Sequence, residues 1–152
     1  MPNLIDTIDI KASPEAVWAV LGDLAATTDW LPGTVNARVD SGTRICVMAD
    51  GSEVHEQIDN YSTTARSYDW QHLRVALPVR DSHGRFSVLT NDSGGATVVL
   101  EMQFVPIDES VVGEVTTMIH GAFHQSLESL RQFVEHGIRW NAALSPDGPQ
   151  SG

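Results

Sequence analysis

The sequence predicts an α+β fold in which a curved antiparallel sheet of about seven strands wraps around one long C-terminal helix. Three observations support this prediction. Short segments of alternating apolar and polar residues recur along most of the chain, as in half-buried strands. Turn signals rich in Gly, Asp, Asn and Ser separate these segments closely, which favours antiparallel pairing of sequential neighbours. A single apolar stripe at helical spacing then runs from Asp108 to Val134.

The N-terminal part is predicted to contain one strand, over residues 5–10, followed by two short helices. Ser13 is a good N-cap residue, and Pro14 suits the first position of the first helix. A second helix is expected over residues 25–30, and Pro32 with the glycine after it should end that helix.

Six further strands are predicted from period-two alternation between turn signals. They are expected at residues 35–39, 44–49, 53–61, 65–73, 84–90 and 96–104. The long helix should begin near Asp108, and because its apolar stripe needs a broad surface to cover, the sheet is its expected partner. Residues 1–143 should form one ligand-binding domain, and residues 144–152, rich in Ser, Pro and Gly, a disordered tail.

The composition excludes several classes of function. The 152 residues include 9 Lys and Arg against 20 Asp and Glu, for a formal charge of −11. Without a cluster of cations, nucleic acid is not an expected partner. No apolar run reaches the ~20 residues of a spanning helix, and no signal peptide is recognisable, so a cytoplasmic protein without membrane insertion is expected, as a monomer or weak homodimer. The single cysteine, Cys46, is interpreted as buried strand filler.

Five stretches, taken in order, resemble a known family. They are residues 13–18 (Ser-Pro-Glu-Ala-Val-Trp), 29–32 (Asp-Trp-Leu-Pro), 54–59 (Val-His-Glu-Gln-Ile-Asp), 77–79 (Leu-Pro-Val) and 121–123 (Gly-Ala-Phe). Over residues 4–135 the chain resembles the bacterial polyketide cyclase/dehydrase-type branch of the START-like (SRPBCC) superfamily. The resemblance implies the helix-grip fold with an internal cavity for a small apolar molecule. Ser82 and Leu100 stand where many relatives carry Tyr and Trp, which predicts an enlarged or reshaped cavity.

Alternation along the strands assigns the inward faces independently of the family resemblance. On the strand over residues 53–61, Val54 and Ile58 indicate that the face they share with Glu56 points inward. On the strand over residues 65–73, the bulky Tyr68 and Trp70 indicate that the face they share with His72 points inward. Glu56 should then lie opposite His72 or opposite Trp70, and in either register within reach of the imidazole. A carboxylate facing an apolar interior is costly unless it is paired. Three interpretations stay open for it: orienting a ligand with His72, acid/base catalysis, or a structural contact with water or backbone, inside or at the cavity mouth.

The inward faces and the helix stripe together predict the lining of the cavity. It is expected to comprise Trp30, Met48, Glu56, Tyr68, Trp70, His72, Ser82, Phe86, Met102, Thr116, His120 and Phe123. Its volume should be roughly 300–1,000 Å³, as in typical ligand sites. His120 and His124 have the i, i+4 spacing of metal ligands, but no carboxylate shares their helix face, so no metal site is predicted. No phosphate loop or nucleotide motif is present, and no cofactor is expected.

Three functions follow from this sequence. The first is binding or carriage of a small hydrophobic molecule that is aromatic, polyketide-like or lipid-like. The second is a cyclase, aromatase or dehydratase in which Glu56 and His72 are the catalytic acid/base pair. The third is an interaction module whose cavity is vestigial. The family resemblance does not decide among them, because its members include carriers, receptors and enzymes.

Overall fold

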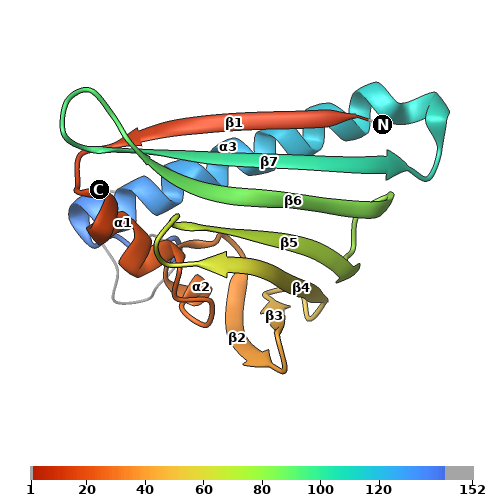
Figure 1. Ribbon diagram of the computed structural model, residues 1–152. Helices are drawn as coiled ribbons and strands as arrows, with labels where there is room; N and C mark the ends of the chain where they lie inside the picture. Colours follow the sequence, from red (N-terminus) through yellow and green to blue (C-terminus); the bar gives the residue numbers. More distant parts are fainter. Residues whose placement is uncertain (1, 143–152) are drawn as a thin grey trace, which may run out of the picture.

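A seven-stranded antiparallel sheet forms the body of the protein, whose computed structural model describes residues 2–142 (Figure 1). The strands are β1 (Asn3–Ile10), β2 (Thr34–Asp40), β3 (Thr43–Met48), β4 (Glu53–Ser62), β5 (Ser67–Arg74), β6 (Val79–Thr90) and β7 (Ala96–Pro106). Their order across the sheet is β1-β7-β6-β5-β4-β3-β2, so a meander from β2 to β7 is closed by β1 at one edge. Every neighbouring pair is antiparallel.

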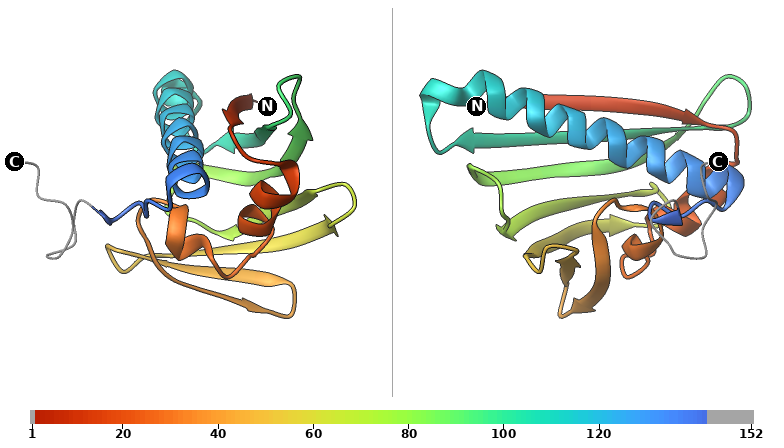
Figure 2. Two further views of the ribbon diagram at one scale, coloured as in Figure 1. Left: turned by 90° about the vertical axis from the view of Figure 1, so that its left-hand side faces the viewer. Right: turned by 180° about the vertical axis from the view of Figure 1, so that it is seen from behind.

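Three helices cover one face of this sheet. They are α1 (Pro14–Leu21), α2 (Thr27–Trp30) and α3 (Val112–His136). Figure 2 shows α3 crossing the sheet diagonally, with α1 and α2 near its C-terminal end. The closest strand to α3 is β1, and α2 packs against β2. The predicted α+β helix-grip architecture is therefore confirmed.

The helix ends follow the local chemistry of the sequence. Ser13 caps α1 by accepting a hydrogen bond from the Ala16 backbone N–H, at 3.1 Å. The last helix begins slightly later than predicted, because a 3-10 turn over Glu109–Val111, capped by Asp108, precedes it. It ends at Gly137, whose φ of 69° requires the left-handed conformation that glycine adopts without strain. The predicted disordered tail lies outside the described residues.

Strand β6 begins five residues earlier than predicted, at Val79 instead of residue 84. The alternation is broken there by a β-bulge, in which Asp81 and Ser82 together lie opposite Phe104. Asp81 takes the left-handed conformation, with φ of 53°. The bulge shifts the parity of the strand, so that Val79 and Ser82 both point inward. A search for alternating apolar and polar residues does not detect a strand segment that a β-bulge interrupts.

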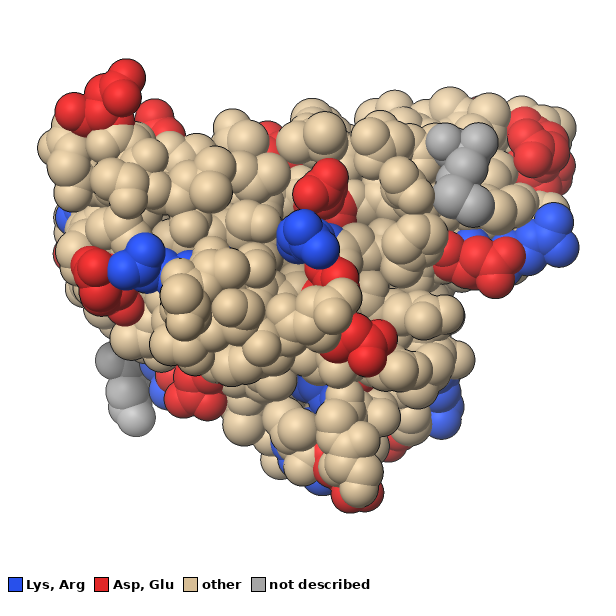
Figure 3. All heavy atoms as spheres, in the orientation of Figure 1, with Lys and Arg blue, Asp and Glu red and all other residues tan. Residues whose placement is uncertain are grey.

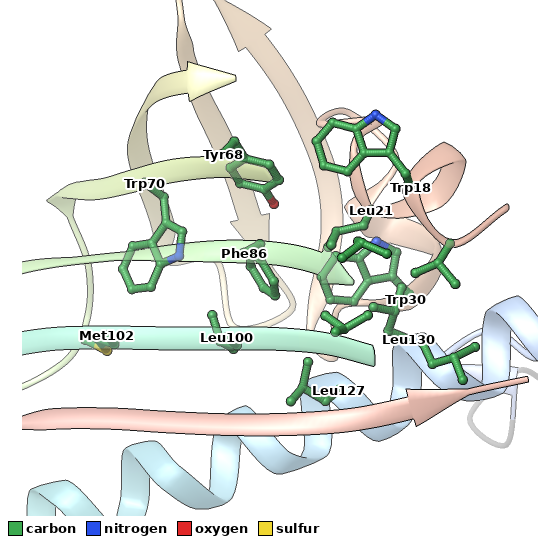
Figure 4. Packing of buried hydrophobic residues seen from close by; sticks show 14 of the residues in the cluster. Trp18, Leu21, Trp30, Tyr68, Trp70, Phe86, Leu100, Met102, Leu127 and Leu130 are labelled. Atoms are coloured by element: carbon green, nitrogen blue, oxygen red, sulfur yellow. The ribbon is translucent and has the colours of Figure 1, made fainter. Parts of the chain in front are cut away.

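The core lies between the helices and the inner face of the sheet. Figure 4 shows aromatic residues of α1, α2, β5 and β6 meeting aliphatic side chains of β7 and α3. Trp30 packs edge to face on Phe86, with ring centroids 6.1 Å apart. Tyr68 contacts the same ring at 5.6 Å, so these aromatic side chains form one continuous cluster.

The surface carries no concentrated positive charge on the face drawn in Figure 3, where Lys and Arg are spread among Asp and Glu. Within residues 2–142, no helix is both long and apolar enough to cross a bilayer.

Candidate functional site

A pocket of about 170 Å³ lies between the inner face of the sheet, α2 and the middle of α3. Its walls come from seven helices and strands, from Leu31 after α2 and from the loop after β5. They comprise Thr27, Trp30, Leu31, Arg44, Cys46, Met48, Val54, Glu56, Trp70, His72, Val75, Leu77, Phe86, Leu100, Phe123 and Ser126. Most of these side chains are apolar, which favours an apolar occupant.

A row of polar side chains crosses the inner face beside the pocket. Arg44 on β3 lies opposite Glu56 on β4, and Glu56 lies opposite His72 on β5. This register confirms one of the two predicted for Glu56. His72 and Ser82 lie one position beyond the Gln71–His83 pair of β5 and β6, so the row continues onto a fourth strand.

The first partner of Glu56 is Arg44. The Arg44 Nε atom donates a hydrogen bond to Glu56 Oε1 at 3.0 Å, and the two side chains are only 3% and 11% exposed. Arg44 Nη1 also donates to the Tyr68 hydroxyl at 3.3 Å. Burial works against the charged form of the guanidinium, but Glu56 and Tyr68 more than offset it, so the pKa of Arg44 is raised. Arg44 therefore stays charged and compensates the charge of Glu56.

Sequence reasoning missed Arg44, although a signal was present. It shares the inward face of β3 with Cys46 and Met48, and Cys46 is buried as predicted. The same alternation that placed Cys46 inside therefore also placed Arg44 inside. The buried carboxylate and the buried guanidinium on adjacent strands could have been matched to each other.

His72 is held by Ser82 and lies near Glu56. Its Nδ1 atom is 2.7 Å from Ser82 Oγ, and its Nε2 atom is 3.8 Å from Glu56 Oε2. Burial lowers the pKa of His72, Arg44 lowers it further, and Glu56 opposes both. The imidazole is therefore neutral near pH 7, with one ring nitrogen as donor and the other as acceptor. A neutral, oriented imidazole beside a carboxylate is a group that can take up or release a proton.

The tryptophans of the pocket are positioned by contacts outside it. Trp70 lies directly opposite Gly84, and a Cβ atom at Gly84 would come within 2.5 Å of the indole ring. Trp30 sits at the end of α2, where its carbonyl oxygen accepts a hydrogen bond from the Ser129 hydroxyl of α3. The segment after α3 also holds α2, because Trp140 Nε1 donates to the Thr28 carbonyl at 2.9 Å.

Of the predicted lining residues, Trp30, Met48, Glu56, Trp70, His72, Phe86 and Phe123 surround the pocket. Tyr68 and Ser82 lie behind its wall, where they bind Arg44 and His72. Met102 is buried elsewhere in the core. Thr116 and His120 lie outside the pocket, and His120 is exposed to solvent, because the part of α3 that reaches the pocket is the turn of Phe123 and Ser126.

The pocket is smaller than predicted and partly open, because the rings of Trp30, Trp70 and Phe86 fill much of the space under the helices. Leu100 is part of its wall. A wider depression of about 470 Å³ shares Met48, Val54, Val75 and Leu77 with it and extends to the β3–β4 turn. The pocket and the depression therefore adjoin each other. In residues 2–142, no group of three or more His, Cys, Asp or Glu side chains is arranged to hold a metal ion.

Comparisons with known proteins agree with this architecture. A family model described as polyketide cyclase / dehydrase and lipid transport matches residues 1–135. A search of curated proteins found no match to this sequence.

Solved structures share the fold at low sequence identity. The protein XoxI from Bacillus cereus has a TM-score of 0.83 and 22% identity, over 90% of this chain and 97% of that one. The Zhui aromatase/cyclase from Streptomyces sp. R1128 has a TM-score of 0.69 and 17% identity, over 97% and 99%. A START superfamily protein from Mycobacterium smegmatis has a TM-score of 0.69 and 12% identity, over 88% and 97%. Because the family model covers most of the chain, the protein belongs to the family described as polyketide cyclase / dehydrase and lipid transport.

Proposed function

We propose that the protein binds and carries a small hydrophobic molecule in the pocket between the sheet and α3. The observation that carries this proposal is a mostly apolar pocket with one polar wall, formed by Arg44, Glu56 and His72. Apolar walls supply affinity, and a few fixed polar groups set the orientation of a ligand. Membership of a family that includes lipid transport supports the same function.

We take the depression beside the pocket as its mouth, and this supports carriage. The depression that shares Met48, Val54, Val75 and Leu77 with the pocket gives a route between the interior and solvent. It is bordered by the β3–β4 turn and by the segment from Val75 to Leu77, which connects β5 to β6. A ligand enters here without separation of α3 from β1.

Native mass spectrometry of the freshly purified protein tests this proposal. We expect a bound small molecule, which is lost when Ser126→Leu places a larger side chain in the pocket. Gln125→Leu is the matched control, because it introduces the same side chain on the exposed side of the same helix turn. A wild-type protein that carries no molecule, and that does not bind small neutral aromatics in titrations, would contradict the proposal and favour an interaction module.

A second function, acid/base catalysis, is favoured by one observation. Burial lowers the pKa of His72, Ser82 holds its ring, and its Nε2 atom lies 3.8 Å from Glu56 Oε2, longer than a direct hydrogen bond, so that both groups could act on one substrate from adjacent strands. In a cyclase or dehydratase using this pair, Glu56→Gln should lower turnover by about 100-fold or more, since general acid/base catalysis contributes about that much. Substrate affinity should change far less. In a carrier, the same variant changes affinity for a polar-headed ligand, and no turnover is measurable with or without it.

A further inference from the structure

The hydroxyl of Ser82 has a single hydrogen-bond partner within residues 2–142, the Nδ1 atom of His72, at 2.7 Å. Ser82 is 1% exposed, so solvent offers its hydroxyl no substitute partner. A buried O–H group that has no acceptor costs free energy. Since Nδ1 is the acceptor within reach, the Ser82 O–H donates to it, and Nδ1 is then the unprotonated nitrogen of the neutral ring.

The surroundings of the other ring nitrogen favour the same tautomer. His72 Nε2 lies 3.8 Å from Glu56 Oε2, whereas Arg44 donates its hydrogen bond to the other carboxylate oxygen, Oε1. An N–H group at Nε2 turns a positive charge toward Oε2, whereas a lone pair there would face the carboxylate with the same sign of charge. Both polar neighbours of the imidazole therefore favour a proton on Nε2 and a lone pair on Nδ1.

The β-bulge in β6 brings the Ser82 hydroxyl to the ring. Asp81 takes the left-handed conformation, with φ of 53°, and the extra residue turns Ser82 toward the inner face. Bulges commonly aim a side chain in this way beside functional sites. Trp70 packs against the same imidazole, with ring centroids 4.8 Å apart. The ring of His72 is thus held by contacts from two strands.

We propose that Ser82 is a positioning residue, whose hydroxyl donates to Nδ1 and holds His72 as the tautomer with its N–H on the Glu56 side. The roles of the pair follow from this tautomer. Glu56 is the group that accepts a proton, whereas His72 keeps its own proton and donates a hydrogen bond to an oxygen atom of the substrate. These roles rest on the acid/base function proposed above, but the tautomer can be measured in the protein without any substrate.

Long-range ¹H–¹⁵N correlation spectra of the ¹⁵N-labelled full chain report the tautomer. At about pH 8 an ordinary imidazole is neutral. Its protonated and unprotonated nitrogens then differ widely in ¹⁵N shift, and Nε2 couples to both carbon-bound ring protons. His72→Gln identifies the signals of His72 among the six histidines. We expect the proton on Nε2. A proton on Nδ1, alone or together with one on Nε2, would overturn the proposal.

Ser82→Ala tests whether Ser82 is the donor. An unprotonated ring nitrogen moves downfield when it loses a hydrogen-bond donor, so the Nδ1 signal should move downfield while the Nε2 signal stays nearly constant. Ser82→Thr keeps a hydroxyl and should restore the wild-type shift. Ser87→Ala is the matched control, because it makes the same change on the outward face of the same strand. An Nδ1 signal that does not move in Ser82→Ala would overturn the role of Ser82.

These spectra separate the positioning role from the proposed catalysis. Where turnover is found, Ser82→Ala should lower kcat by about tenfold, as the loss of about one hydrogen bond allows, with little change in KM. Ser82→Thr should restore it. A proton on Nε2 without turnover on any substrate would contradict the catalytic function and leave the positioning of His72 by Ser82 standing. Turnover by a protein whose proton is on Nδ1 would do the reverse. If Ser82→Ala fails to fold, the wild-type tautomer and the Ser82→Thr spectrum still decide.

Discussion

The two halves of the sheet's inner face differ in what they bury. Under α3, strands β1, β7 and β6 present apolar side chains such as Val98, Met102 and Phe104, which are almost fully buried. On β3, β4 and β5, the same face carries the Arg44–Glu56–His72 row beside a pocket. The difference follows from the path of α3, whose closest strands are β1 and β7. Tight apolar packing is concentrated in one half, and buried polar side chains beside the pocket in the other.

The largest effect is expected when one member of the buried Arg44–Glu56 pair, on β3 and β4, is removed. Arg44→Leu removes the guanidinium that donates a hydrogen bond to the buried Glu56 carboxylate. Removal of one partner from a buried ion pair typically costs about 3–5 kcal/mol. We expect a loss of that size in the free energy of unfolding, measured by urea titration.

The double variant Arg44→Leu with Glu56→Leu sharpens this prediction. Because two apolar residues replace a buried ion pair with little loss or some gain, most of the stability should return. If Arg44→Leu alone costs less than about 1 kcal/mol, in the range of exposed pairs, the pair is hydrated and the polar half is not buried in solution.

One methionine in each half allows a direct comparison of packing. Met102 is 1% exposed in the packed half, whereas Met48 lies half-buried at the pocket and its mouth. Met102→Ala should cost about 2–4 kcal/mol, because it creates a cavity in close-packed surroundings. Met48→Ala should cost about 1 kcal/mol, because Met48 already borders open space. Equal losses in urea unfolding would remove the distinction between the halves.

His72 should make the polar half sensitive to pH. Since burial lowers the pKa of His72 below its ordinary value of 6.5, the unfolded chain binds a proton at higher pH than the folded protein does. Stability from this residue is therefore fully present above a pH of about 6.5 and is lost as the pH falls, by no more than about 1.4 kcal/mol per pH unit. Urea midpoints between about pH 7 and 5 measure it. His72→Gln should flatten the profile, and the exposed His120→Gln should not.

The smallest effect is expected at the hydrogen bond that joins Trp140, after α3, to α2. Trp140→Phe removes the hydrogen bond to the Thr28 carbonyl, which should cost about 1 kcal/mol. The indole resonance of Trp30, two residues further along α2, should broaden or shift as its helix loosens. An unchanged Trp30 signal would show that the remaining contacts, made by Ser129 to the Trp30 carbonyl and by Arg139 to Asp29, are enough to hold the end of α2.

Prediction from the sequence succeeded where the pattern is local. Alternation on β4 and β5 placed Glu56, Tyr68, Trp70 and His72 inside, and the count of residues across the turn limited Glu56 to two registers. It missed the start of β6, because the bulge at Asp81 reverses the parity of the strand. It also missed the Arg44–Glu56 pair, because the face of Glu56 was matched only to the strand that follows it and not to the preceding strand, which carries Arg44.

The sequence by itself determined the elements, the inward faces and the α+β class, because periods of two and of 3.6 residues are properties of neighbouring positions. Only the tertiary structure decided which inward residues meet in one pocket. The direction of α3 brings Phe123 and Ser126 to the pocket and leaves His120 in solvent. The volume of the pocket likewise depends on how side chains from distant segments pack, which no local pattern encodes.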